Sequence, residues 1–224
     1  MRKYQRLTAF SRVIAAMVCG CSSTPDVDST PCVQLESAPH DDFEQPTASP
    51  CSWGQLSQLD CTATVENGDL VMAPKPGAGD VFCVCGATQL IPFTSTFGTI
   101  AEVHDVATEV GEDSVLVALA SVEAWRVGYD AAMDMLFFEH IMGDERTRFG
   151  YAPWDPAAVW WRVRLDEDAV IGEVSADGER WVRIGADHTR PPPEMILPSF
   201  MTLTSQPVAA PSTVRIGSFN VCPP

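Results

Sequence analysis

The stretch WWRVRLDEDAVIGEVSADGERWVRI, residues 160–184, decides the fold class of this 224-residue chain. Apolar and polar residues alternate over its first six positions, and side chains on a β-strand alternate between the two faces of the sheet. Trp161, Val163 and Leu165 therefore share one face, while Trp160 lies on the other. The acidic DED run is typical of a solvated hairpin tip, and the glycine of SADG suits the positive φ of a tight turn. We predict an antiparallel meander of three strands, at residues 160–165, 170–174 and 181–184.

The rest of the chain also consists of short apolar runs separated by glycine, proline and aspartate, and no segment predicts a long helix. Residues 131–142 are ambiguous, because their apolar spacing fits a short helix as well as a strand. Strand-like runs on both sides, at turn-sized distances, favour a strand from Met135 to Met142. The sequence predicts an all-β fold, an antiparallel β-sandwich with at most short helices. Further strands are expected at residues 68–73, 81–90, 99–106, 114–121, 125–129 and 146–151.

The first twenty residues have the composition of an export signal. Four basic residues and no acidic one accompany an apolar run at residues 13–18, which is too short to cross a bilayer as a helix. Val18-Cys19-Gly20-Cys21 resembles a bacterial lipobox, with Cys21 as the lipid attachment site. Ordinary signal-peptide cleavage is the alternative. Because a serine follows Cys21, we expect an outer-membrane lipoprotein of the bacterial cell envelope, with residues 1–20 as a lipoprotein-type signal peptide.

The residues that follow the signal divide into a linker and one domain. Residues 21–40 are rich in serine, proline and aspartate, a composition typical of flexible linkers. The pattern of short apolar runs begins at Asp41. We therefore expect a linker at residues 21–40 and a β-sandwich domain at residues 41–224, tethered to the membrane through the lipid on Cys21.

The charge of the chain limits its partners. The sequence has 14 basic and 30 acidic residues, and removal of residues 1–20 takes away four of the basic ones. The mature chain then has a formal net charge of −20. Such a field repels nucleic acid, anionic lipid headgroups and acidic polysaccharides. A neutral glycan, a cation or a basic protein patch remains compatible with it.

Six cysteines remain once the two in the signal region are set aside. An even number in an exported chain predicts three disulfides, for which fifteen connectivities exist. Cys83 and Cys85 would share one face of a strand and are therefore poor partners for each other. A metal or redox pair at these two positions is the alternative, but no histidine or further cysteine lies at a known ligand spacing. Cys51 and Cys61 are close enough in sequence to close a short loop. The six are Cys32, Cys51, Cys61, Cys83, Cys85 and Cys222.

Two segments carry a resemblance to a known superfamily. YAPWDPAAVWWRVR at residues 151–164 and SADGERW at residues 175–181 are similar to the concanavalin A-like lectin/glucanase (laminin G-like jelly-roll) superfamily. Residues 41–43 resemble its opening edge strand, and residues 217–221 resemble its closing strand. The resemblance implies two packed antiparallel sheets, one of them concave, with the first and last strands as neighbours. Members include glycan-binding modules, glycosidases and structural domains, so the fold does not by itself give the function.

No catalytic motif is recognisable. The glucanases of this superfamily have an E-x-D-x-x-E strand that places a carboxylate pair on one face. The nearest segment here has Glu102, then His104 in place of the aspartate and Ala107 in place of the second glutamate, which favours solvated strand residues. Nucleophile-elbow, zinc-binding and phosphate-binding signatures are absent. We predict no catalytic residue, no metal ligand and no cofactor, with loop-bound calcium as the alternative that some relatives suggest.

Aromatic side chains are the remaining candidates for ligand binding. Sugar rings stack on exposed aromatic rings, and Trp125, Tyr129, Trp160 and Trp181 could provide such a surface, although burial in the core is the alternative. We therefore predict a non-catalytic, envelope-anchored module that binds a neutral glycan or a protein partner at the cell surface or in the periplasm. The alternative is a glycoside hydrolase of the same superfamily with an atypical carboxylate pair. A purely structural envelope role fits the sequence equally well.

Overall fold

The computed structural model describes residues 27–44, 49–52, 54–77, 81–204 and 206–224. In these residues the chain forms β-strands and no helix, which confirms the predicted all-β class. No helix with the length and apolar character of a membrane span occurs there. The strands are β1 (Val27–Asp28), β2 (Gly54–Leu59), β3 (Cys61–Glu66), β4 (Asp69–Pro74), β5 (Val81–Ala87), β6 (Ile91–Pro92), β7 (Thr99–Asp105), β8 (Glu112–Ala120), β9 (Glu123–Asp130), β10 (Met135–Met142), β11 (Glu145–Pro153), β12 (Trp160–Asp166), β13 (Ala169–Ser175), β14 (Trp181–Asp187), β15 (Met195–Thr204) and β16 (Val214–Phe219).

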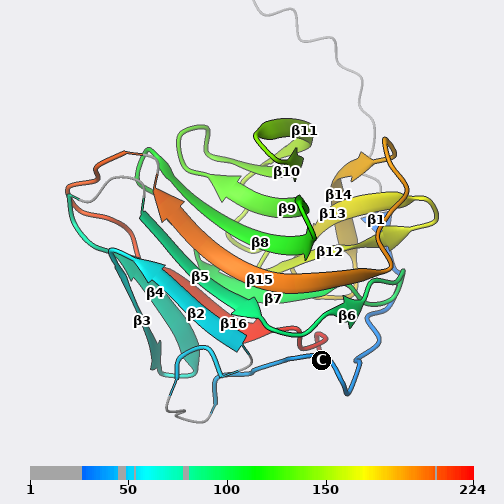
Figure 1. Ribbon diagram of the computed structural model, residues 1–224, viewed down its shortest axis with the longest axis horizontal. Coiled ribbons are helices and arrows are strands. Elements are labelled where there is room, and N and C mark those ends of the chain that lie inside the picture. Colours follow the sequence, from blue (N-terminus) through cyan, green and yellow to red (C-terminus); the bar gives the residue numbers. More distant parts are fainter. Residues whose placement is uncertain (1–26, 45–48, 53, 78–80, 205) are drawn as a thin grey trace, which may run out of the picture.

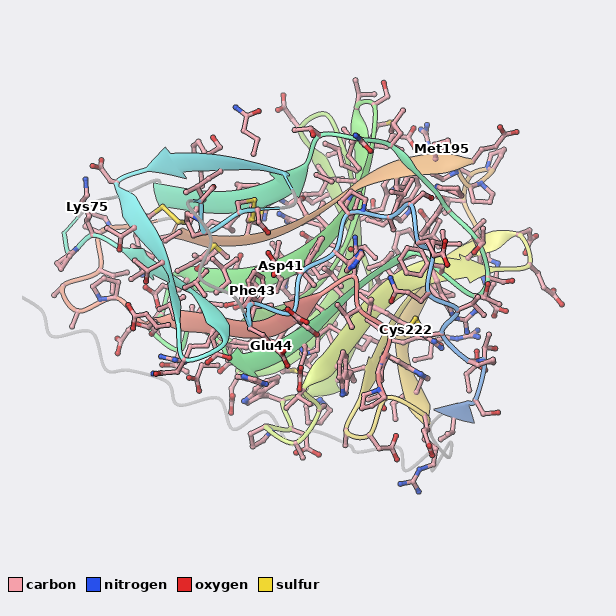
Figure 2. The ribbon with its side chains drawn as sticks, turned by 90° about the horizontal axis from the view of Figure 1, so that it is seen from below. Asp41, Phe43, Glu44, Lys75, Met195 and Cys222 are labelled. Carbon is pink, nitrogen blue, oxygen red and sulfur yellow. A yellow bond between two sulfur atoms is a disulfide. The ribbon has the colours of Figure 1, made fainter. Side chains whose placement is uncertain are left out.

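The strands form two antiparallel sheets that pack face to face (Figure 1). Sheet A has the strand order β1-β14-β13-β12-β7-β16-β4-β3. Sheet B has the order β11-β10-β9-β8-β15-β5-β2, and β6 pairs with β15. The orange β15 and the red β16 lie in different layers when the molecule is seen from below (Figure 2). The architecture is the predicted β-sandwich.

The stretch at residues 160–184 folds as the predicted meander. β12 pairs with β13, and β13 pairs with β14, all antiparallel. The turn residues Glu167 and Gly178 both have positive φ angles, of 54° and 75°. A second meander, β9-β10-β11, contains Met135–Met142 as a strand, so the short-helix alternative does not occur. Alternation and turn chemistry predicted the first meander, and strand-like runs at turn-sized distances predicted the second.

The core lies between the two sheets and takes the expected face of β12. Trp161 and Val163 are fully buried within it. At one end the sandwich closes tightly, because Gly150 of β11 lies against Ile184 of β14, where an added Cβ would be 1.8 Å from the Ile184 carbonyl oxygen. Only glycine allows this approach. The first and last segments are neighbours as expected, since Asp41 bridges to Phe219.

The six predicted disulfide cysteines form three bridges: Cys32–Cys222, Cys51–Cys85 and Cys61–Cys83. Cys83 and Cys85 point inward from the same face of β5, so each reaches a partner on another segment. Cys61 belongs to sheet A and Cys83 to sheet B, and their bridge links the sheets. The suggested loop between Cys51 and Cys61 is not formed. Sequence proximity was a poor guide because the sandwich brings distant strands together.

Residues 27–40, which were expected to be part of a linker, pack against the domain instead. We call this segment the strap. β1 adds to the edge of β14, Cys32 is bonded to Cys222, and Ala38 is buried. The chain continues from the strap to Asp41, Phe43 and Glu44, which Figure 2 labels. The folded part therefore begins before residue 41.

Candidate ligand-binding site

Each sheet has an outer face, the one that points away from the core. On β9, Val127 belongs to the core, so the alternate residues Arg126, Gly128 and Asp130 lie on the outer face of sheet B. The register of the neighbouring strands then places polar side chains of β8, β10 and β11 beside them. We call this group the polar cluster; it comprises Asp113, Arg126, Asp130, Glu139 and Arg148.

A glutamate held between two arginines organises the polar cluster. Glu139 is fully buried and forms ion pairs with Arg126 and, at 3.2 Å, with Arg148 Nε. Arg148 Nη1 also reaches Asp130 Oδ2 at 3.1 Å. A carboxylate without such partners would be very costly to bury, because desolvation disfavours an isolated charge. The pairing fixes the position of Arg148 on the outer face.

Arg148 in turn positions two aromatic rings. Its guanidinium lies 4.6 Å from the ring centroid of Phe137 and 5.4 Å from that of Tyr151. Arg148 Nη1 donates a hydrogen bond of 3.2 Å to the Tyr151 hydroxyl. Phe137 is buried, whereas Tyr151 is 47% exposed. A cation over a ring face is attractive, so Tyr151 is an exposed ring in a defined place.

Asp113 stands apart in the polar cluster because it faces another carboxylate. It is the cross-strand register partner of Asp130. Burial, and then the charge of Asp130, raise the pKa of Asp113 to about 6, and Arg126 and Arg148 only partly oppose this. A carboxyl group with a perturbed pKa on an open sheet face is a candidate functional group.

The four aromatic residues predicted to bind a ligand lie elsewhere. Trp125 and Tyr129 are in the core between the sheets, with 1% and 4% exposure. Trp181 is fully buried on the outer face of sheet A. The guanidinium carbon of Arg162 lies 3.8 Å from its ring centroid. These three rings therefore offer no free face to a sugar. The reason is that the core lies on one face of each strand, and the strap covers the part of the outer face of sheet A around Arg162 and Trp181.

Trp160 is also buried, at 7% exposure, but it borders a hollow. The hollow has a volume of about 670 Å³, and Glu102, His104 and Asp69 line it as well. The His104 imidazole bonds Asp69 at 2.9 Å and Glu102 at 3.2 Å, and Gly217 leaves room for the ring. Partial burial tends to lower the pKa of His104, but the hydrogen bonds to Glu102 and Asp69 outweigh it and raise the pKa above 6.5.

Because both ring nitrogens of His104 are engaged, this residue is poorly placed to exchange a proton with a ligand. His104 and Glu102 of β7, together with Asp69 of β4, therefore form a structural hydrogen-bond network on the outer face of sheet A. Among the described residues, no group of three or more histidine, cysteine, aspartate and glutamate side chains could hold a metal ion. Cys21 lies outside the described residues.

No protein-family model and no curated protein sequence matches the chain. Solved structures share its fold. SCLam, described as a non-specific endo-β-1,3(4)-glucanase from family GH16, is 11% identical with a TM-score of 0.60, over 87% of this chain and 94% of that one. A LamA variant from Z. galactanivorans in complex with laminaritriose and laminaritetraose is 6% identical with a TM-score of 0.55, over 80% and 96%. A family 16 endo-glucanase from Bacteroides ovatus is 8% identical with a TM-score of 0.53, over 80% and 98%. The chain therefore has the jelly-roll fold of these glucanases.

Proposed function

We propose that the outer face of sheet B binds a neutral glycan. The observation that carries this proposal is the exposed ring of Tyr151, which Arg148 holds beside Asp130. An aromatic ring can stack on the apolar face of a sugar, while fixed polar groups beside it give orientation through hydrogen bonds to hydroxyls. Arginine and aspartate are well suited to this because their planar groups bind two hydroxyls at once.

The charges favour a neutral ligand over an anionic one. The polar cluster has three carboxylates, Asp113, Asp130 and Glu139, against the two guanidinium groups of Arg126 and Arg148. The mature chain as predicted has a net charge of −20, and such a field repels polyanions. The shared fold is consistent with this choice, since one similar structure holds laminaritriose and laminaritetraose.

The test is calorimetric titration of the mature domain with laminaritetraose. We expect Tyr151→Ala to weaken binding by about 1–3 kcal/mol, on the scale of base stacking on aromatic side chains. Met133→Ala, which removes another exposed apolar side chain, is the matched control and should bind as the wild type does. Equal binding by wild type and Tyr151→Ala would reject Tyr151 as the stacking ring.

Hydrolysis of the bound glycan is a second candidate function, and the Asp113–Asp130 pair favours it. Glycosidases use one protonated and one ionised carboxyl group, and a pKa of about 6 would let Asp113 act as an acid. Release of reducing ends from laminaritetraose would support this function. Asp113→Asn should then abolish release without abolishing binding. Binding without any release would leave the non-catalytic module as the function.

We also propose that the domain is tethered to the bacterial envelope through Cys21. The support is the sequence pattern described above, a lipobox-like segment that ends in Cys21. Cys21→Ser should release the protein from the membrane fraction, because acylation of that thiol supplies the anchor. Undiminished membrane association of this variant would reject the lipid anchor.

A further inference from the structure

Two carboxylates of the polar cluster face each other across adjacent strands. Asp113 of β8 is directly opposite Asp130 of β9. Like charges in this arrangement destabilise a sheet. Arg148 forms an ion pair with Asp130, whereas no cationic group of the described residues lies within ion-pair distance of Asp113. The cross-strand pair therefore contains one carboxylate without a compensating partner.

We propose that Asp113, which faces Asp130, takes up a proton on mild acidification, and that this protonation weakens glycan binding at the outer face of sheet B. Protonation would turn Asp113 from a hydrogen-bond acceptor into a donor. The natural acceptor for that donor is the facing carboxylate of Asp130.

The surroundings of Asp113 support uptake near neutral pH. On β9 the charged neighbours are Asp130 and Arg126, and on β10 and β11 they are Glu139 and Arg148. The other register neighbour, Leu203 of β15, carries no charge. Burial and the charge of Asp130 raise the pKa of Asp113 to about 6, and Arg126 and Arg148 lower it only in part.

The two protonation states would present different surfaces to a sugar. When both carboxyls are ionised, each can accept hydrogen bonds from ligand hydroxyls, and these bonds relieve the repulsion between Asp113 and Asp130. When Asp113 is protonated, its hydroxyl and the Asp130 carboxylate satisfy each other. Proton uptake and glycan binding therefore compete. The coupling rests on the proposed glycan-binding function, whereas proton uptake by Asp113 does not.

Proton uptake is tested without a ligand by carboxyl ¹³C NMR between about pH 4 and about pH 8. We expect the wild type to show a titration step near pH 6 at the carboxyl carbon of Asp113. Asp113→Asn should remove the step, and Asp168→Asn, the same change at a largely exposed residue, should keep it. A wild type without the step, or a step that survives in Asp113→Asn, would overturn proton uptake by Asp113.

The coupling is tested by calorimetric titration with laminaritetraose at about pH 7.5 and about pH 5. A pKa of about 6 predicts roughly tenfold weaker binding at the lower pH for the wild type and for Asp168→Asn. Asp113→Asn should bind with the same affinity at both pH values. Equal wild-type affinities would overturn the switch. An absence of binding at both pH values would reject the glycan function and its coupling, while the NMR titration still decides on proton uptake by Asp113.

Discussion

The two outer faces of the sandwich contain the same arrangement of charges with opposite surroundings. On sheet A, Glu173 lies between Arg162 and Arg164, and Arg162 stacks on Trp181. On sheet B, Glu139 lies between Arg126 and Arg148. Both glutamates are fully buried.

The two groups differ in which residues supply the remaining partners of the arginines. On sheet A the strap supplies them: Asp28 pairs with Arg164, and the Thr30 carbonyl accepts a hydrogen bond of 3.0 Å from Arg162. On sheet B the side chains of the face itself do so, through Asp130 and the exposed Tyr151. The same Arg–Glu–Arg unit thus serves as a core extension on one face and as the framework of an accessible site on the other.

Loss of the strap's covalent attachment should have the largest effect. Replacing Cys32 and Cys222 together by serine opens a loop closed over 190 residues, which the chain-entropy relation converts to roughly 5 kcal/mol of unfolding free energy. The matched double variant of Cys61 and Cys83 opens a loop of 22 residues and should lose roughly 3 kcal/mol. Chemical denaturation measures both. A smaller loss for the long loop would contradict the structural role assigned to the strap.

The next largest effect is expected when the central glutamate of each outer face is replaced, and the loss of stability should differ between the two faces. Glu173→Gln leaves two almost fully buried arginines short of a counter-charge and should cost about 3–5 kcal/mol of stability. Glu139→Gln should cost less, about 1–3 kcal/mol, because it takes the ion pair from one buried arginine, Arg126, while Arg148 is 24% exposed and keeps its ion pair with Asp130. Glu145→Gln, at an exposed position, is the control for the change of charge. Equal costs in urea denaturation would remove the distinction between a covered and an open face.

Asp113→Asn should stabilise the protein, and only at higher pH. The pKa of Asp113 is raised from 3.8 to about 6 by burial and by Asp130, so its ionised form is less favourable in the folded state than in the unfolded state. This penalty is absent below about pH 4, grows between about pH 4 and about pH 6, and is complete above that range. The gain should reach at most about 3 kcal/mol at pH 7 and vanish at about pH 4. A gain that does not depend on pH would show that packing, not charge, limits this position.

The smallest effect is expected at Tyr151. Tyr151→Ala removes a half-exposed ring and should change stability by less than about 1 kcal/mol. Trp181→Ala on the other face removes a fully buried ring and should cost about 3–5 kcal/mol. Thermal unfolding of the two variants side by side gives the comparison. A large loss for Tyr151→Ala would make that ring part of the packing and weaken the case for a binding surface.

Much of the fold could be predicted because its signals are local. Alternation over residues 160–165 gave the buried face of β12, with Trp161 and Val163 in the core. The acidic tip and Gly178 gave the turns, and an even number of cysteines gave three bridges. Each of these depends on neighbours a few residues apart, where strand geometry and turn conformation leave few choices.

The candidate site could not be predicted in the same way. Its members come from four strands, and only the register brings Asp113 opposite Asp130 and Arg148 beside Glu139. The sequence offered a weak signal, a glutamate in the apolar run MLFFEHIM followed by alternating arginines at residues 146 and 148. We predicted Trp125, Tyr129, Trp160 and Trp181 as binding residues instead, since sugar rings stack on aromatic side chains. The large apolar area of such rings favours their burial in a core.

The sequence by itself therefore determined the all-β class, the two meanders, the buried face of β12 and the number of bridges, because these signals act over short distances. The tertiary structure alone decided which outer face is covered, which cysteines meet and which charges become neighbours. Those outcomes depend on the packing of strands far apart in the chain. The strap shows this most clearly: its composition is that of a linker, and its contacts with Arg162, Arg164 and Cys222 make it part of the fold.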